Sequence, residues 1–195
     1  MVFELSLAQL FLSKYMKLVI LDRDGVLNQD SDEYVKSVDE WQPLPGSMEA
    51  CGRLCQAGFT LAVATNQSGL ARGYFNLADL EAMHAKMENL AAAHGGHFSH
   101  IAYCPHGPDD QCTCRKPLAG LIDEIEQRLN ISAQGAYMVG DSIRDLQAGL
   151  AKGCVPVLVR TGKGAQSEAK LSAEGLSNTL VFDDLAAFTD YLLNK

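Results

Sequence analysis

Short apolar runs alternate along this chain with longer segments in which apolar and polar positions follow a helical period. The runs predict buried strands because they are short and bounded by turn residues. The predicted strands cover residues 18–21, 59–64, 98–103, 136–139, 155–159 and 180–182. The predicted helices cover residues 47–57, 77–94, 117–129, 143–152 and a last segment that ends near 193. Strands that alternate with helices imply a sheet covered on both faces, so the pattern predicts an α/β fold with a doubly wound, mostly parallel sheet.

Three helix boundaries carry signals of their own. Asn76 is a favoured N-cap residue, and Asp79, three positions later, brings the pair close to a capping box. Pro117 stands at the start of a predicted helix, where proline is favoured in the first turn. Gly58 follows the helix predicted over residues 47–57 and is a typical stop. These residues set the predicted ends of three helices.

The bulk composition is that of an ordinary globular protein. The chain has 195 residues, of which 47% are hydrophobic and 21% charged, so one domain with a substantial core is expected. No apolar stretch approaches the roughly 20 residues needed to span a bilayer. The formal net charge of -8 argues against a nucleic-acid partner, which normally requires a basic face. We therefore expect a cytoplasmic monomer, without a membrane or nucleic-acid partner, that acts on a small molecule.

Residues 1–15 are expected to form an extension outside the domain. The segment is rich in apolar residues, but Glu4 stands where a signal peptide would carry positive charge, and no small-residue cleavage site follows. An amphipathic surface helix is one interpretation of this segment, and it carries no chemistry that we identify. Residues 16–195 are predicted to be a single domain.

Polar residues follow directly after several of the predicted strands. Asp22 and Asp24 follow the first strand, Thr65 ends the second, and Asp141 follows the fourth. The carboxyl ends of strands are where open α/β sheets bind their ligands. Taken singly, each segment also has an ordinary explanation, as a turn, as a helix N-cap or as a solvated pair of charges. Their order along the chain therefore has to decide between the two interpretations.

Taken together, these segments resemble the four ordered motifs of the haloacid dehalogenase-like phosphatases. The motifs are Asp22-x-Asp24-Gly25-x-x-Asn28, then Thr65-Asn66-Gln67-Ser68-Gly69, then Arg115-Lys116-Pro117, and last Gly140-Asp141-Ser142-x-x-Asp145. The sequence is most similar to the branch that contains the heptose bisphosphate and histidinol phosphatases, from about residue 16 to the C-terminus. The resemblance implies a Rossmann-like sheet of the haloacid dehalogenase type.

The resemblance also implies a phosphatase that forms an aspartyl-phosphate. Asp22 would be the nucleophile, and Asp24 the general acid that protonates the leaving alcohol and later activates water. Mg²⁺ suits a site made of Asp22, the backbone carbonyl of Asp24 and Asp141. Lys116 would supply fixed positive charge, because phosphoryl transfer depends mainly on positioning and charge neutralisation. Asp145 lies one helical turn after Asp141, and a supporting role is expected for it.

A group of cysteine and histidine residues precedes the third motif: Cys104, His106, Cys112 and Cys114. Three thiolates and an imidazole suit tetrahedral structural zinc and leave no open position for water. The spacing is tighter than in common zinc fingers, but the phosphatases that this chain resembles carry a zinc loop at the same place. Disulfide bonds are the alternative, and they need an oxidising compartment, for which no targeting signal is visible. We predict structural Zn²⁺.

The short intervals between the motifs leave no room for a large cap domain, so an open site is predicted. Specificity would then depend on a flap over residues 29–41 and on the zinc-binding loop over residues 104–114. The resemblance implies a small phosphorylated sugar as substrate, with removal of the 7-phosphate of D-glycero-D-manno-heptose 1,7-bisphosphate for lipopolysaccharide-type heptose synthesis. Substrate contacts are predicted for Asn28, Asp30, Tyr34, Thr65, Asn66, Gln67, Ser68, Arg115 and Lys116.

Several alternatives remain open from the sequence. Histidinol phosphate is the second candidate substrate, with Asp32 and Glu33 as acidic neighbours for its ammonium group. A polynucleotide-end phosphatase is more distant, because the chain is acidic. Outside catalysis, an aspartyl-phosphate receiver or a zinc-stabilised binding module would fit parts of the pattern. Arg72 and Lys163 lie in further segments that resemble the family, and whether either contacts substrate is left open.

Overall fold

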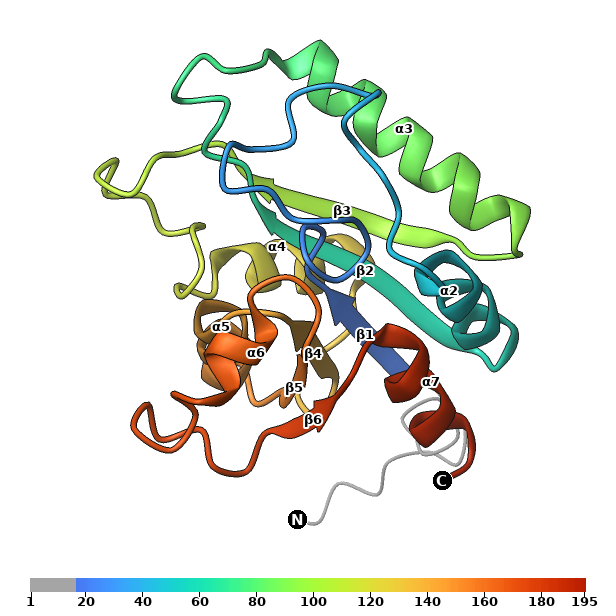
Figure 1. The fold of residues 1–195 in the computed structure, drawn as a ribbon. Coiled ribbons are helices and arrows are strands. Elements are labelled where there is room, and N and C mark those ends of the chain that lie inside the picture. Colours follow the sequence, from blue (N-terminus) through green and yellow to red (C-terminus); the bar gives the residue numbers. More distant parts are fainter. Residues whose placement is uncertain (1–16) are drawn as a thin grey trace, which may run out of the picture.

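The computed structural model describes residues 17–195, so the predicted extension over residues 1–15 lies outside the described part of the chain. Within residues 17–195, six strands form one sheet in the order β3-β2-β1-β4-β5-β6 (Figure 1). The strands are β1 (Lys17–Leu21), β2 (Phe59–Asn66), β3 (Phe98–Cys104), β4 (Tyr137–Gly140), β5 (Val155–Val159) and β6 (Leu180–Phe182). Every pairing between neighbouring strands is parallel, which confirms the predicted sheet.

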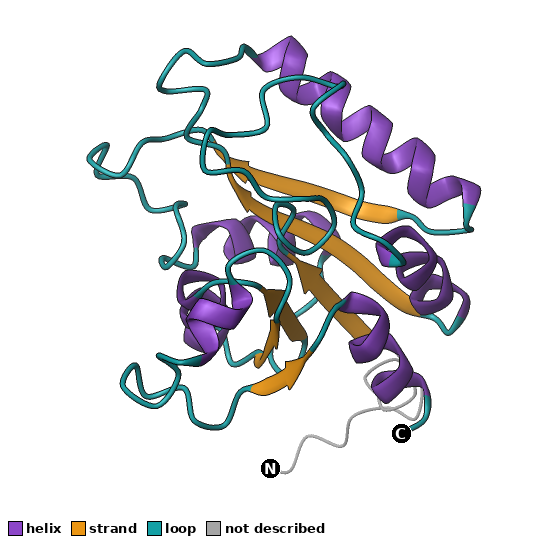
Figure 2. Cartoon of the chain, viewed as in Figure 1, coloured by secondary structure: helices purple, strands orange, loops and turns teal. Residues whose placement is uncertain are grey.

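Helices cover both faces of this sheet (Figure 2). They are α2 (Ser47–Gln56), α3 (Leu77–Ala93), α4 (Gly120–Leu129), α5 (Ile143–Ala151), α6 (Gly164–Glu168) and α7 (Leu185–Leu193). Apolar side chains of α2, α3 and α7 pack into one core, and those of α4 with part of α5 pack into a second core on the opposite face. Within the described residues no further folded domain is inserted between the strands, as the motif spacing predicted.

The first strand separates the two cores. Val19 and Leu21 belong to the core beneath α2, α3 and α7, whereas Leu18 and Ile20 belong to the core beneath α4. Successive side chains of a strand point to opposite faces, so a strand that is buried on both sides must be apolar at every position. This requirement explains why residues 18–21 form a continuous apolar run and not an alternating one.

Most predicted boundaries hold within one or two residues, and the start of α4 is wrong. The expected capping box of α3 is present, because Asn76 and Asp79 exchange backbone-to-side-chain hydrogen bonds of 2.9 and 3.1 Å. The predicted helix over residues 117–129 begins only at Gly120. Its first residues form a turn instead, since the Lys116 backbone is bonded to the Asn66 side chain of β2 through both its N–H and its carbonyl. A tertiary contact thus overrides the local preference of Pro117.

The short helix α6 was not predicted. Its sequence, Gly-Ala-Gln-Ser-Glu, has no apolar period, and the segment is too short for a periodic pattern to be recognised. The reason for its fold is therefore tertiary, and its contacts bear on the active site, as shown below.

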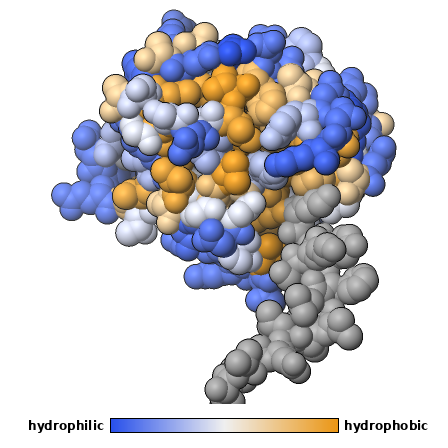
Figure 3. Space-filling view, turned by 90° about the horizontal axis from the view of Figure 1, so that it is seen from below, coloured by the Kyte–Doolittle hydropathy of each residue, from blue (hydrophilic) through white to orange (hydrophobic). Residues whose placement is uncertain are grey.

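The surface carries polar and apolar residues side by side. On the face seen in Figure 3, hydrophilic and hydrophobic residues are interspersed across the described part of the chain. No helix among the described residues has the length and apolar character that crossing a membrane would require.

Candidate active site

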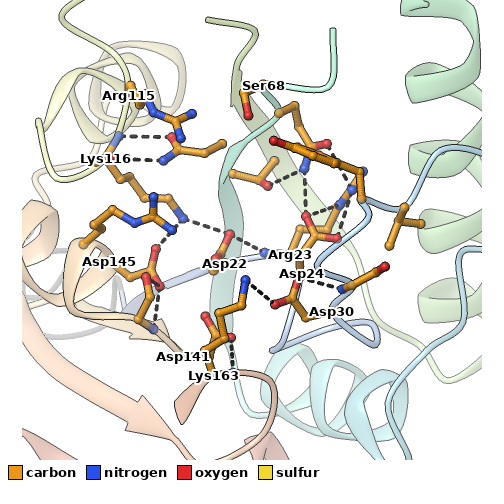
Figure 4. Close-up of a pocket in the computed structure, with 18 of the residues that line it drawn as sticks. Asp22, Arg23, Asp24, Asp30, Ser68, Arg115, Lys116, Asp141, Asp145 and Lys163 are labelled. Carbon is orange, nitrogen blue, oxygen red and sulfur yellow. Dashed lines mark hydrogen bonds and ion pairs between the residues drawn. The ribbon is translucent and has the colours of Figure 1, made fainter. Parts of the chain in front are cut away.

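The carboxyl ends of β1, β2 and β4 meet at one edge of the sheet. β1 lies between β2 and β4, and the chain order of the strands reverses there. Such a switch point is where open α/β sheets bind ligands. A cavity of about 220 Å³ opens at this place and is lined by the residues that follow these three strands, by the flap and by Arg115 and Lys116 (Figure 4).

A buried lysine joins the carboxylates at the floor of this cavity. Lys116, only 2% exposed, places its Nζ 2.8 Å from Asp22 Oδ1 and 2.6 Å from Asp145 Oδ1. It donates a further hydrogen bond to the Ala64 carbonyl at 2.6 Å. These three acceptors match the three N–H donors of an ammonium group. Figure 4 shows Lys116 between Asp22 and Asp145. Its ammonium group is therefore held by residues of β2, of the turn after β1 and of α5.

The charges in this cluster are unbalanced. Burial and the Asp145 carboxylate raise the pKa of Asp22 well above its usual range, although Lys116 opposes this effect. Burial and Asp145 also raise the pKa of Asp141, to about 7. Burial disfavours the charge on Lys116, but Asp145 and Asp22 outweigh it and raise the lysine pKa. Negative charge therefore exceeds positive charge at the cavity floor, and a further cation would relieve the repulsion.

The donor set fits Mg²⁺. Asp22, Asp141 and Asp145 each offer a carboxylate oxygen, and these ligand atoms lie within 4.8 Å of one another. Hard oxygen ligands in a negatively charged site suit Mg²⁺, which usually keeps several waters beside one or two carboxylates. Asp145 is also occupied by Ser142, whose N–H and Oγ donate to Asp145 Oδ2 at 3.0 and 2.7 Å. These contacts tie the Asp145 side chain to the start of α5, and its supporting role stays a prediction.

The second aspartate of the first motif is held differently. Arg23, 1% exposed, donates from Nε and Nη2 to the two carboxylate oxygens of Asp24 at 3.2 and 3.0 Å. Asn28 Nδ2 and Gln67 Nε2 donate to the same carboxylate at 2.9 and 2.8 Å. Burial alone would raise the pKa of Asp24, but the Arg23 charge and these hydrogen bonds outweigh burial and lower it. Four hydrogen bonds from Arg23, Asn28 and Gln67 thus hold the Asp24 carboxylate in place.

Two predicted substrate contacts belong to this arrangement. Asn28 is fully buried and does not line the cavity, since its amide donates to Asp24 and to the Gln29 carbonyl. Gln67 lines the cavity but is bonded on both sides, with Nε2 donating to Asp24 and to Thr65 Oγ1, each at 2.8 Å. The structure therefore places both amides behind Asp24, where they orient it and the Thr65 hydroxyl.

The flap over residues 29–41 covers one side of the cavity. Trp41 is fully buried, and Lys86 of α3 donates to the carbonyls of Val38 and Trp41 at 2.8 and 2.7 Å, which anchors the flap. Tyr34 packs edge-on against Tyr74 with ring centroids 5.0 Å apart. The predicted contact residues of the flap, Asp30 and Tyr34, line the cavity, as do Thr65, Asn66, Ser68 and Arg115. The flap is thus positioned to contact a substrate.

The cysteine and histidine residues form a second cluster, in the loop after β3. One ligand atom each of Cys104, His106, Cys112 and Cys114 lies within 4.8 Å of the others. Sulfur-to-sulfur distances of 3.1 Å from Cys114 to Cys104 and 3.7 Å from Cys104 to Cys112 show that these thiols are close but unbonded. Three thiols and an imidazole at this proximity can hold tetrahedral Zn²⁺. The cluster that the spacing predicted is therefore present.

Comparisons with known proteins agree with this geometry. A family profile described as HAD-hydrolase-like matches residues 113–188. A D-glycero-beta-D-manno-heptose-1,7-bisphosphate 7-phosphatase of Pseudomonas aeruginosa is 57% identical over 90% of this chain and 97% of its own. A protein of the same name from Neisseria meningitidis is 52% identical over 92% of this chain and 96% of its own. The chain belongs to the heptose 1,7-bisphosphate phosphatase family.

Solved structures of the heptose bisphosphate phosphatase family share the fold. The Bordetella bronchiseptica enzyme, crystallised with magnesium and phosphate, superimposes with a TM-score of 0.87 at 54% identity, covering 92% of this chain and 99% of that chain. The Burkholderia thailandensis enzyme superimposes with a TM-score of 0.70 at 46% identity, with the same coverage. The predicted family and fold class are confirmed.

Reasoning from the sequence of this family member missed two residues of the site. Arg23 occupies the variable position between the two aspartates of the first motif, so the sequence alone gives it no role. An arginine beside an acid becomes a recognisable signal only once it is known to be buried. Arg144 is the second residue of α5 and lines the cavity. It resembles any exposed helix residue in the sequence, so no local signal could have identified it.

Proposed function

We propose that this protein is a Mg²⁺-dependent phosphatase that removes the 7-phosphate of D-glycero-D-manno-heptose 1,7-bisphosphate. One observation carries the proposal. Asp22 and Asp24 both follow β1 and line the same cavity, and the buried ammonium group of Lys116 lies at the floor of that cavity. A nucleophile, an acid or base and a fixed cation are the groups that phosphate ester hydrolysis needs. The relatives named above support the choice of substrate.

The chemistry of this chain's residues follows in two halves. An Asp22 oxygen bonds to phosphorus while the bond from phosphorus to the sugar oxygen breaks, and Asp24, in its protonated form, supplies the proton that this oxygen takes up. Water then attacks the phosphorus of the aspartyl-phosphate, Asp24 accepts a proton from the water, and phosphate leaves Asp22. The Thr65 hydroxyl holds a phosphoryl oxygen, and Lys116, whose three N–H donors are already bonded, supplies a fixed positive charge beside the reacting group. Asp22, the Asp24 carbonyl and Asp141 would hold Mg²⁺, which would supply charge neutralisation when bound.

A bisphosphate has a second phosphate that must be held away from the reaction. A hollow of about 370 Å³ beside the cavity shares Arg115 and Arg144 with it. Arg115 donates to the His106 carbonyl at 3.2 Å, so the zinc-binding loop fixes its direction. Two guanidinium groups at the junction suit the non-reacting phosphate, and such remote contacts can contribute to kcat as well as to KM.

Histidinol phosphate fits less well. Asp32 and Glu33 of the flap are the acidic residues that the sequence offers to its ammonium group. Asp32 instead lies 3.1 Å from Lys163 Nζ, and Glu33 does not line the cavity. The residues that a cationic substrate would need are therefore already paired or lie elsewhere.

A comparison of kcat/KM on one preparation tests the substrate. We expect heptose 1,7-bisphosphate, measured as both anomers, to exceed fructose 1,6-bisphosphate and histidinol phosphate by at least about tenfold. Arg144→Ala should raise KM for the bisphosphate and leave a sugar monophosphate unaffected, with Arg128→Ala, at an exposed helix position, as the matched control. A lead for histidinol phosphate would move the substrate assignment and leave the chemistry in place.

The remaining expectations concern the setting of the enzyme. We infer a cytoplasmic monomer with one structural Zn²⁺ in the loop over residues 104–114. The substrate of the named relatives supports the cytoplasmic assignment. Sedimentation at micromolar concentration tests the oligomeric state, and a stable dimer would contradict it.

A further inference from the structure

The segment after β5 makes contacts that neither the motifs nor the proposed chemistry use. Residues 161–167 follow β5, contact Asp141 and include most of the unpredicted helix α6. Lys163 donates its backbone N–H to Asp141 Oδ2 at 2.8 Å. Ser167 is 7% exposed and donates its hydroxyl to the Asp141 carbonyl at 2.8 Å. The segment therefore holds both the side chain and the backbone of one residue.

Close packing adds to these hydrogen bonds. Gly25 and Gly162 flank the Asp141 carboxylate, and a Cβ atom on either glycine would overlap Asp141 Oδ2. Their φ angles of +83° and +56° lie in the left-handed region that favours glycine. The hydroxyl of Thr161 donates to the Gly25 carbonyl at 2.6 Å and ties the two glycine turns together. The carboxylate thus lies in a slot with backbone on two sides.

This slot determines which oxygen of Asp141 is available. Oδ2 accepts the Lys163 N–H, which leaves Oδ1 as the Asp141 oxygen to which no hydrogen bond is made among the described residues. Thr161, Gly162 and Ser167 do not line the cavity, and they cannot act on substrate directly. Any effect they have on the site must pass through Asp141 or Gly25.

We propose that residues 161–167 are a positioning element for Asp141, which holds its carboxylate in the orientation that binds the divalent cation. The inference rests on the proposed role of Asp141 in binding Mg²⁺. Groups that orient a metal-ligating carboxylate typically affect metal affinity by about 10- to 100-fold. The element acts before chemistry, so its loss weakens cation binding and leaves the reaction of the loaded enzyme nearly intact.

Direct binding of Mn²⁺, followed by electron paramagnetic resonance and calorimetry, tests this proposal. The protein is freed of Mg²⁺ by dialysis, and its zinc content is checked to be unchanged. Ser167→Ala and Gly162→Ala should each weaken Mn²⁺ binding by about tenfold or more. At saturating Mg²⁺, kcat should return to within about threefold of the original value, because the residues act through affinity.

The chain offers matched controls for both variants. Gly175 also has a positive φ, +71°, but nothing lies within 4 Å of its Cβ position, so Gly175→Ala tests backbone strain without the slot. Ser177→Ala removes an exposed hydroxyl. Both controls should bind Mn²⁺ as the unmodified protein does. Thermal unfolding without metal shows how much stability each substitution costs, and therefore separates a structural effect from loss of the ligand's orientation.

Asp141→Asn separates this inference from the assignment on which it rests. If Asp141→Asn abolishes Mn²⁺ binding while Ser167→Ala and Gly162→Ala bind like their controls, the positioning role is wrong and the metal site stands. If Asp141→Asn binds Mn²⁺ normally, the assignment of the metal ligand fails. If one of the two variants does not fold, the other still decides the question.

Discussion

The carboxylate cluster and the cysteine–histidine cluster bring their ligand atoms equally close, yet they are built in opposite ways. Asp22 and Asp141 follow two strands more than a hundred residues apart, Asp145 lies in the first turn of α5, and all three are buried or nearly so. The four residues of the other cluster lie within the segment 104–114, and most of them are partly exposed. One site is assembled by the sheet, and the other by a single loop.

This difference indicates which of the two sites needs its metal ion in order to become ordered. At the carboxylate site, Lys116 already offsets part of the negative charge, and the ends of β1 and β4 and the first turn of α5 position the three carboxylates. Such a site is organised in advance, as electrostatic catalysis requires. The loop over residues 104–114 contains no strand or helix of its own beyond the end of β3, so binding of zinc and ordering of the loop are coupled.

The largest effect should come from the nucleophile, because it separates catalysis from folding at the sheet-built site. Asp22→Asn keeps the shape but removes the attacking charge, and we expect kcat to fall by at least about 10⁴-fold. Circular dichroism and unfolding should show that the fold is retained, since the neighbouring strands hold the site. Substantial phosphate release by a mass-verified variant would contradict the mechanism.

The second test removes Lys116, the buried lysine that offsets the negative charge of the carboxylate cluster. Lys116→Met leaves Asp22 and Asp145 buried without their partner, so the free energy of unfolding should fall by about 3–5 kcal/mol without Mg²⁺. Mg²⁺ should recover part of this loss, since it also relieves the repulsion. Urea unfolding with and without Mg²⁺ measures both effects.

The control for Lys116 is a lysine in ion pairs at the surface. Lys152 is paired with Asp123 and Glu126 at 2.7 and 2.8 Å, and Lys152→Met should cost no more than about 1 kcal/mol. Equal losses for the two variants, insensitive to Mg²⁺, would show that the buried lysine does not balance the carboxylates.

The third test concerns the loop-built site. Cys112→Ala should reduce zinc from about one ion per chain to a trace, and should make the segment 104–114 sensitive to proteolysis. The loop also holds the adjacent Arg115 through the His106 carbonyl, so kcat should fall, but by no more than about tenfold. Elemental analysis and limited proteolysis measure the loss, and Cys55→Ala, outside the loop, should retain zinc. Full zinc retention by Cys112→Ala would refute the ligand set.

The smallest expected effect is the contribution of His84 to the pH dependence of stability. His84 is 8% exposed, packs against Tyr103 at 6.1 Å, and has its pKa lowered to about 4 by burial and by the Arg23 charge, against a weaker opposing effect of Asp24. The folded pKa lies below that of an unfolded histidine, about 6.5, so His84 has no effect above that pH and costs stability as the pH falls from 6.5 towards 4.

Replacement of His84 should remove this pH dependence. Between pH 7.5 and pH 5, His84→Phe should lose less unfolding free energy than the unmodified protein, by about 1–2 kcal/mol. His97→Gln, at an exposed position, is the control and should follow the unmodified protein. An identical pH dependence for all three proteins would show that His84 is not held neutral.

Much of the architecture follows from local sequence. The apolar runs of β1 and β5 are recognisable because a strand buried on both faces admits no polar position. Asn76 and Asp79 define the start of α3 because a capping box is a contact between residues three apart. The zinc cluster belongs to the same class, since its four ligands are neighbours in the chain. The order of the four motifs likewise indicates the family without any coordinates.

What only the tertiary structure decided involves residues distant in sequence. Because the Asn66 side chain is hydrogen-bonded to the Lys116 backbone, α4 begins only at Gly120. No residue near Pro117 in the sequence indicates this contact. Arg23 becomes part of the site because folding buries it against Asp24, and Ser167 because β5 delivers α6 next to Asp141. Local sequence determines the preferences of a segment, whereas burial and long-range hydrogen bonds depend on which strands become neighbours, and that is fixed only when the sheet forms.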